Sequence, residues 1–183
     1  RVFGIMNFGA NAEFVRLKES SALARMPAGL PFEESAAIFD GAFQGLAALR
    51  RGNVDEGTRL LVYGASGSCG TAAVQLGKAL GLRTIAVAGD EAKREFAVRC
   101  GADHAVLSDG WLAAVRDLVG ERAVDIVVDP VGSDRMTDSL RSLAPEGRLL
   151  VLGFAGGEIP VVKVNRLLLG NTGVLGVASR EFF

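Results

Sequence analysis

A glycine-rich loop is the part of this sequence best suited to binding a charged ligand. It runs from Gly64 to Gly70 as Gly-x-x-Gly-x-x-Gly, after an apolar run at residues 60–63 and before a helical stretch. A helix start offers unpaired backbone N–H groups and the positive end of a dipole, and Gly67 and Gly70 would let a pyrophosphate approach them closely. The usual fingerprint is Gly-x-Gly-x-x-Gly, but the position between strand and helix predicts dinucleotide binding. The alternative is a glycine-rich turn that serves packing alone.

The end of the next apolar run indicates which nicotinamide dinucleotide would bind. Domains that prefer NAD usually carry a carboxylate there, which holds the ribose hydroxyls. Here the run ends at Gly89, Asp90 follows, and Lys93 and Arg94 come next, where cations could pair with a 2′-phosphate. We therefore expect NADPH as the cofactor, with NADH less favoured. The alternative is that Asp90 caps a helix whose first turn is simply a solvated run of charges.

A repeated unit of apolar run, turn and helical stretch begins at Leu60. This rhythm predicts an α/β fold with a doubly wound (Rossmann) parallel sheet of six strands, because crossover helices join parallel strands. We expect strands at residues 60–63, 84–88, 105–107, 125–128, 148–152 and 174–177. We expect helices at residues 71–80, 91–99, 111–119 and 134–143.

The pattern before Leu60 is different. Residues 12–17 alternate loosely like a strand, residues 22–26 form another candidate strand, and a helical region begins near Pro31 and closes at Gly52. Because the chain starts without Met and stops just after an expected strand, we expect it to be part of a longer protein.

Composition excludes several classes of function. The 20 basic and 21 acidic residues nearly cancel, so no strong field favours nucleic acid or an anionic membrane. No apolar run approaches the roughly 20 residues that span a bilayer. Cys69 and Cys100 are too few for a disulfide framework, and no cluster of Cys or His offers metal ligands. We expect a cytoplasmic protein without a bound metal, acting on a small molecule.

Three single residues invite functional interpretations that we set against packing. Cys69 at a helix start could be a reactive thiol and His104 an acid or metal ligand, whereas the single aromatic Trp111 lies on an amphipathic helix, where such residues usually fill core space. Cys69 has no resolving cysteine nearby, and His104 has no partner at ligand spacing. We expect all three to have structural roles.

Several motifs, in order, resemble the medium-chain dehydrogenase/reductase superfamily, specifically its zinc-independent NADPH:quinone oxidoreductase branch. The resemblance covers almost the whole chain. Its motifs lie at residues 8–15, 26–37, 64–70, 73–76, 93–97, 101–104, 127–132 and 147–154. It implies that residues 1–31 are the end of a mostly β catalytic (GroES-like) domain, 32–57 a helical connector, and 58–183 the Rossmann domain.

The resemblance also implies roles for individual residues. Within the glycine-rich loop that includes Gly64 and Gly67, the pyrophosphate would face Ser68, Cys69 and Gly70. The adenosine phosphate would lie near Gly89, Asp90 and Lys93, and the ribose beside the loop from Asp129 through Val131 to Gly132. The nicotinamide would be bordered by Gly153, Phe154 and Ala155.

Two departures from the family pattern concern the cofactor. Where relatives carry Thr-Ala-Tyr in the connector helix, this chain has Gln44-Gly45-Leu46, so Gln44 would replace a threonine near the nicotinamide. A tyrosine expected near the 2′-phosphate is replaced by Ser108 and Asp109.

The implied chemistry is hydride transfer from NADPH to a quinone or an activated enone or enoyl double bond, a small-molecule acceptor, by a homodimer. No side chain is an evident catalytic acid, so the catalytic residues stay unassigned and solvent would supply the proton. The alternatives are an enoyl reductase domain of a multi-domain synthase and a dinucleotide-binding module without turnover.

Overall fold

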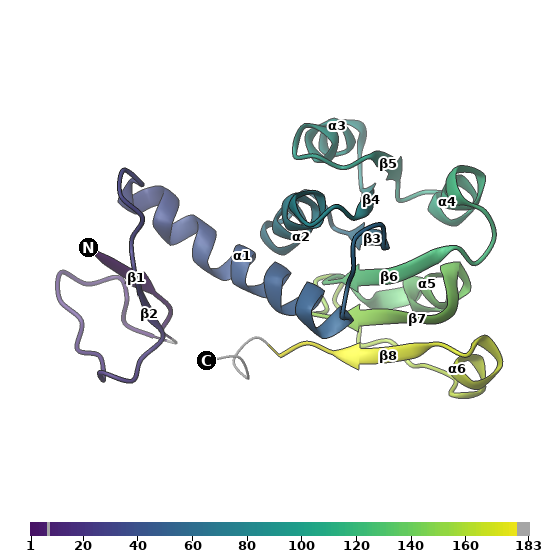
Figure 1. The fold of residues 1–183 in the computed structure, drawn as a ribbon. Helices are drawn as coiled ribbons and strands as arrows, with labels where there is room; N and C mark the ends of the chain where they lie inside the picture. The colour runs from purple at the N-terminus through teal and green to yellow at the C-terminus, as the bar shows by residue number, and fades with distance from the viewer. Residues whose placement is uncertain (7, 179–183) are drawn as a thin grey trace.

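A six-stranded parallel sheet with helices on both faces forms the larger part of the molecule (Figure 1). The computed structural model describes residues 1–6 and 8–178; residue 7, and residues 179–183 at the end of the expected Rossmann domain, lie outside the described residues. The expected doubly wound α/β fold is confirmed. The strands are β3 (Arg59–Tyr63), β4 (Arg83–Ala88), β5 (His104–Leu107), β6 (Val124–Asp129), β7 (Leu143–Val151) and β8 (Gly173–Gly176). The helices are α2 (Ser68–Ala79), α3 (Glu91–Arg99), α4 (Trp111–Val119), α5 (Met136–Ser142) and α6 (Asn165–Gly170).

The strand order β5-β4-β3-β6-β7-β8 places a switch point between β3 and β6. The chain proceeds outward from β3 to β5, returns to β6 beside β3, and continues outward to β8. In this centre Val62 lies opposite Ala86 on one side and Val128 on the other. Open parallel sheets bind ligands at the carboxyl ends of the strands near such a point. The loops after β3 and β6 therefore border the expected crevice.

Alternating side chains of the central strands supply two cores, one on each face of the sheet. Leu60 and Val62 pack on one face, and Leu61 and Tyr63 on the other. Both faces are buried because helices cover both. On the second face Trp111 is 5% exposed, and its ring stands edge-on to Tyr63 with centroids 5.1 Å apart. The expected packing role of Trp111 is confirmed.

A small antiparallel sheet precedes the long helix α1 (Phe32–Gly52), which runs from it to the large sheet (Figure 1). It consists of β1 (Val2–Gly4) and β2 (Leu23–Arg25), and the ring of Phe3 packs edge-on against Phe39 of α1 at 5.4 Å. The expected strand near residues 22–26 is confirmed by β2. The strand expected at residues 12–17 is wrong. Phe14 there is 92% exposed, so the alternating pattern buries neither face.

Other differences from expectation lie toward the carboxyl end. The helix expected at residues 134–143 begins as a 3₁₀ turn at Ser133–Arg135 and ends at Ser142, because Leu143 is already extended and begins β7. Next to that start, β7 pairs irregularly with β6: Leu143 is opposite Val124, and the regular register resumes only at Arg148. The six-residue α6 was not expected, since it is too short for a helical period to stand out.

Candidate cofactor site

The loop after β3 presents backbone N–H groups at the start of α2. Gly64 turns the chain with φ of +55°, and Gly67 is the N-cap of the helix in an extended conformation. The first intrahelical bond runs from the Thr71 N–H to the Gly67 carbonyl at 2.8 Å. The N–H groups ahead of it have no intrahelical acceptor and form the positive end of the helix dipole. These groups belong to Ser68, Cys69 and Gly70.

Gly67 and Gly70 serve different purposes in this loop. A Cβ on Gly70 would overlap the carbonyl oxygen of Gly64 and lie 2.8 Å from the Cα of Ala65. Glycine is therefore needed there for the loop to close on the helix. A Cβ on Gly67 would have only the Gly64 oxygen within 4 Å, at 3.3 Å. Gly67 is thus the position where a side chain would enter the space in front of the helix.

Asp129, the last residue of β6, turns its carboxylate toward the following loop. The residue is 1% exposed, and its Oδ1 accepts the N–H groups of Val131 and Gly132, each at 2.8 Å. Its Oδ2 is buried without a hydrogen-bond partner among the described residues. Asp129 therefore fixes the course of residues 130–132, and a ligand beside this loop would meet those residues and not the Asp129 carboxylate.

The loops after β6 and β7 are hydrogen-bonded to each other beyond the end of the sheet. Three N–H groups of the second loop donate to three consecutive carbonyls of the first. The bonds are Leu152 to Asp129 at 2.9 Å, Ala155 to Pro130 at 3.1 Å, and Gly156 to Val131 at 2.8 Å. The two loops thus form one continuous platform.

This platform also touches the phosphate loop. Val131 Cγ2 lies 3.2 Å from the place that a Cβ would take on Gly64. Gly132 has φ of +67°, and the ring of Phe154 lies 2.9 Å from the Cβ position of Gly132. The loops after β3, β6 and β7 therefore pack in series across the carboxyl edge of the sheet.

At the end of β4, Asp90 and Lys93 form an ion pair beside Gly89. The Asp90 carboxylate caps α3 by accepting the Lys93 N–H at 2.9 Å, and Lys93 Nζ lies 2.8 Å from the other carboxylate oxygen. These hydrogen bonds from Lys93, with its charge, hold the pKa of Asp90 below its usual value. No atom lies within 4 Å of the Cβ position of Gly89. Asp90 is thus a helix cap, and it also holds the Lys93 ammonium next to the strand end.

Helix α1 approaches α2 closely because two of its facing residues are glycines. A Cβ on Gly41 would lie 2.8 Å from the Ser68 carbonyl oxygen, and one on Gly45 would lie 3.0 Å from the Ala73 nitrogen. The pair Gly41 and Gly45, one helical turn apart, was the sequence signal for this contact, and sequence reasoning missed it.

The close approach places Gln44 against Cys69. The Cys69 thiol donates to Gln44 Oε1 at 3.3 Å, and Gln44 Nε2 donates to Asp40 at 2.9 Å. Burial raises the pKa of Cys69 above its usual range. The thiol is therefore held protonated and hydrogen-bonded, which agrees with the structural role expected for it.

The expected site residues all lie in the loops and helix starts after four strands. Those after β3 are Gly64, Gly67, Ser68, Cys69 and Gly70; after β4, Gly89, Asp90 and Lys93; at the end of β6, Asp129 and Val131; and after β7, Gly153, Phe154 and Ala155. Pro130 and Gly132 belong to the loop expected beside the ribose, and both contact the loop after β7, through the Pro130 carbonyl and the close approach of Phe154 to Gly132. His104, expected to be structural, opens β5 at the opposite edge with its side chain exposed.

The described part of the chain has neither a cluster of metal-ligating side chains nor a helix that could span a membrane. No three His, Cys, Asp or Glu side chains gather there as a metal site would require. No helix there has the length and apolar character needed to cross a membrane.

Comparison with known proteins shows which family this chain belongs to. Residues 69–181 match the family model described as zinc-binding dehydrogenase. Quinone oxidoreductase-like protein 2 of Rattus norvegicus is 38% identical over 183 residues, which cover 97% of this chain and 51% of the relative. The chain spans about half the length of the curated relatives it matches.

Solved structures of similar fold include two quinone oxidoreductases studied with NADPH. The Thermus thermophilus enzyme shares 35% identity and a TM-score of 0.74 over 85% of this chain and 50% of the other. The Escherichia coli enzyme, in complex with NADPH, shares 26% identity and a TM-score of 0.82 over 88% and 51%.

Proposed function

This chain belongs to the medium-chain dehydrogenase/reductase superfamily, in its quinone oxidoreductase-like branch, and from that premise we propose that it is the NADPH-binding part of a zinc-independent reductase. The whole enzyme would pass a hydride to a quinone or to an activated carbon–carbon double bond. The observation that carries the proposal is the free amide cluster at the start of α2, at the switch point of the sheet.

The described residues fit an NADPH molecule at the carboxyl edge of the sheet. The Gly67 Cβ position has only the Gly64 oxygen within 4 Å, so the space beside Gly67 is open, and the pyrophosphate would bind there next to the three free amides. Lys93 would take the 2′-phosphate, and the platform of residues 130–132 and 153–155 would border the ribose and nicotinamide. The bound NADPH would supply the hydride, while these residues orient it and exclude water from one side.

The described side chains near this edge favour an acceptor that needs no protein acid. Tyr63 is 2% exposed, and burial raises its pKa far above neutrality. Asp129 is committed to loop amides, and Cys69 is protonated and paired with Gln44. Solvent would therefore provide the proton that accompanies the hydride.

We extend the proposal to assembly and domain division. Within residues 1–6 and 8–178, strand β8 is an edge strand that pairs with β7 alone, and the adjoining segment exposes Val161, Val164, Leu168 and Leu169 by 73–88%. An unpaired edge beside an apolar patch favours a homodimer across this edge. Residues 1–31, with β1 and β2, would belong to the catalytic domain, 32–57 to the connector, and 58–183 to the Rossmann domain. Two free thiols suit a cytoplasmic protein.

Calorimetric titration of NADPH and NADH tests the cofactor assignment, with Gly67→Val as the informative variant and Ala79→Val, at the exposed far end of α2, as its control. We expect NADPH to bind the wild type and the control, and not Gly67→Val. Binding of NADPH by Gly67→Val with wild-type affinity would contradict the site.

Measuring turnover distinguishes a quinone acceptor from an enoyl thioester acceptor. NADPH oxidation by the intact protein is followed with a quinone and, separately, with a 2-enoyl thioester. Faster reduction of the quinone supports the proposal, exclusive reduction of the thioester indicates an enoyl reductase, and binding without either reaction indicates a dinucleotide-binding module.

A further inference from the structure

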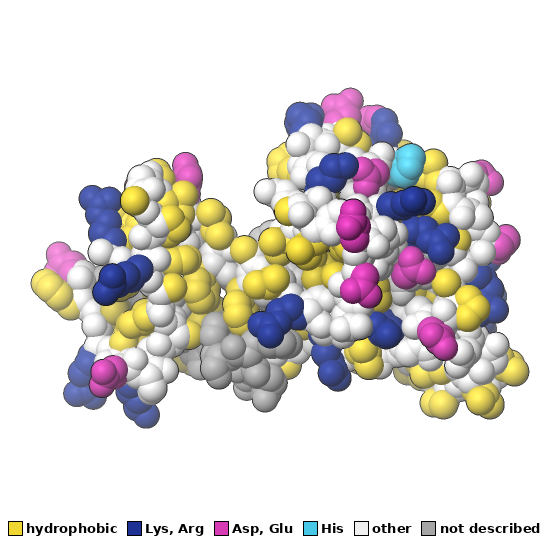
Figure 2. Space-filling view, in the orientation of Figure 1, with side chains coloured by type: hydrophobic (Ala, Val, Ile, Leu, Met, Phe, Trp, Pro, Cys, Tyr) yellow, Lys and Arg dark blue, Asp and Glu magenta, His cyan; other side chains and the backbone are white. Residues whose placement is uncertain are grey.

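A cavity of about 400 Å³ opens at the amino edge of the sheet, opposite the candidate cofactor site. Arg59, Arg83 and His104 line it, and they are the first residues of the adjacent strands β3, β4 and β5. Because parallel strands all begin at the same edge, three residues far apart in sequence meet at one place. Figure 2 shows the single histidine beside a group of Lys and Arg side chains.

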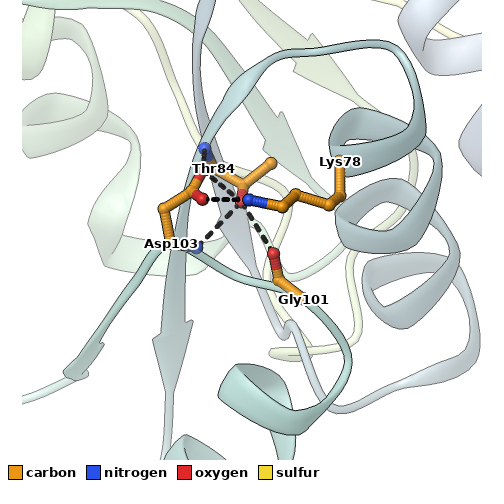
Figure 3. A network of polar contacts seen from close by, with 4 residues as sticks. All are labelled: Lys78, Thr84, Gly101 and Asp103. Carbon is orange, nitrogen blue, oxygen red and sulfur yellow. Dashed lines mark hydrogen bonds and ion pairs between the residues drawn. The ribbon is translucent and has the colours of Figure 1, made fainter.

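The carboxylates around this cavity are already engaged. Asp103 accepts Lys78 Nζ at 2.6 Å on Oδ1, and the backbone N–H and hydroxyl of Thr84 at 2.8 and 3.1 Å on Oδ2 (Figure 3). Asp125 accepts the backbone N–H of Arg59 at 2.8 Å and its Nε at 3.3 Å. The charge of Asp103 is therefore balanced by Lys78, and the charge of Asp125 by Arg59.

Arg83 supplies the unpaired positive charge of this cavity among the described residues. Within residues 1–6 and 8–178 its side chain has no ion pair and no hydrogen bond, and it is exposed at the cavity. Arg59 keeps its outer guanidinium nitrogens clear of Asp125, since only Nε contacts that carboxylate. His104 adds a third donor without a side-chain partner in the same part of the chain. The cavity therefore offers unpaired donors and a net positive charge.

The floor of the cavity is apolar. Ile85, only 1% exposed, lies behind the arginines, and Leu118 and Val119 at the end of α4 complete the wall. Guanidinium groups bind carboxylates and phosphates through paired N–H groups, and an apolar floor favours a ligand body without charge. Cavities of this size accept small organic molecules.

We propose that this cavity is a second ligand site, for a small organic anion whose carboxylate or phosphate group binds Arg83 and Arg59 and whose apolar body rests on Ile85 and Leu118. The site lies at the edge of the sheet opposite the dinucleotide, so the protein binds both ligands at the same time and neither displaces the other. Occupancy links β3, β4, β5 and α4, and it raises the thermal stability of the protein.

Benzoate and phenyl phosphate are the probes, with benzamide as the neutral analogue and inorganic phosphate as the anion without an apolar body. Binding to the intact protein is measured by calorimetry and by NMR shifts of the amides of residues 83–85 and 104. We expect saturable binding of at least one aromatic anion, at least tenfold weaker binding of benzamide, and unchanged anion binding when NADPH is present. Preference for phenyl phosphate or for benzoate identifies the anionic group.

Arg83→Met is the informative variant, because Arg83 has no structural partner to lose, and Arg51→Met, an exposed arginine of α1, is its control. We expect Arg83→Met to weaken anion binding at least tenfold with NADPH affinity unchanged, and Arg51→Met to change neither. The proposal fails if no probe saturates, if benzamide or inorganic phosphate binds as well as the aromatic anions, if Arg83→Met binds them normally, or if NADPH displaces them.

Discussion

Asp129 holds Gly132 in a conformation with positive φ: the Gly132 N–H donates to Oδ1 at 2.8 Å, and φ at Gly132 is +67°. The ring of Phe154 packs 2.9 Å from the Cβ position of Gly132. By holding Gly132, Asp129 therefore also determines where the loop after β6 contacts Phe154. Because Asp129 is buried, its influence on a ligand would pass through this loop.

Replacing Asp129 with Ala should therefore weaken NADPH binding through the loop. The variant leaves two loop N–H groups without their acceptor, so we expect at least tenfold weaker binding and a loss of about 1–3 kcal/mol in the free energy of unfolding. Calorimetry and urea denaturation measure the two quantities. Asp129→Asn keeps an oxygen acceptor and should recover most of both losses. If Asp129→Asn lost as much NADPH affinity and stability as Asp129→Ala, the negative charge of Asp129, and not the hydrogen bonds that it accepts, would be responsible.

Gly70→Ala tests the division of roles within the phosphate loop. Its methyl group would overlap the Gly64 carbonyl, so we expect a loss of about 1–3 kcal/mol in the free energy of unfolding, as overpacking causes. Gly67→Val should lose less stability than Gly70→Ala, since Gly67 is already extended and only one atom lies within 4 Å of its Cβ position. Urea denaturation of the two variants side by side measures the difference. A Gly67→Val variant less stable than Gly70→Ala would reverse the assignment.

The strands and their order along the chain were predictable from sequence because most are short apolar runs, and the central ones, β3, β4 and β6, are buried on both faces. The start of β7 was not, because its first pair, Leu143 with Val124, precedes an irregular stretch around Pro145 that has no simple apolar pattern. The pattern at residues 12–17 was misleading because alternation alone does not supply a partner strand.

The candidate site was predictable as a set of loops and less so as a set of side-chain contacts. The spacing of the glycines predicted that Gly70 would let the pyrophosphate approach the helix start. In the structure, the place that a Cβ would take on Gly70 is occupied by the chain's own backbone. Asp90 and Lys93 were treated as alternatives, cap or phosphate ligand, and the structure joins them in one ion pair. Contacts of this kind depend on backbone positions that residue types do not specify.

The ion pair of Lys93 with Asp90 gives a prediction about cofactor preference. Lys93→Ala removes the ammonium at the end of β4, so we expect NADPH to bind at least tenfold more weakly and NADH to be little affected. Asp90→Asn keeps the cap through its amide oxygen and frees the ammonium, so the NADPH preference should rise. Arg99→Ala, in the last turn of the same helix, is the control for a general loss of positive charge. Titrations with both cofactors measure the ratio, and an equal effect of Lys93→Ala and Arg99→Ala would reject a specific role for Lys93.

The last prediction concerns acid stability and the network around Asp103 (Figure 3). Burial alone would raise the pKa of Asp103, but hydrogen bonds from Lys78 and Thr84, with the Lys78 charge, outweigh it and hold the pKa below its usual value. A carboxyl whose pKa is lowered by folding stabilises the protein fully above its unfolded pKa of about 4, and this contribution is lost as the pH falls through the lower folded pKa. The free energy of unfolding should therefore fall below about pH 4.

Asp103→Asn isolates this contribution, because the other acids of the chain titrate equally in both proteins. At pH 7 the variant loses charge-assisted hydrogen bonds, so we expect it to be about 1–3 kcal/mol less stable than the wild type. Near pH 3 the gap should narrow, since the unfolded wild type binds a proton there that the folded Asp103 carboxylate, with its lowered pKa, binds only at lower pH. Urea denaturation at the two pH values measures the gap, with Asp109→Asn, an exposed acid, as the control. A gap of the same size at both pH values would mean that the ionised Asp103 carboxylate contributes nothing that its neutral form lacks.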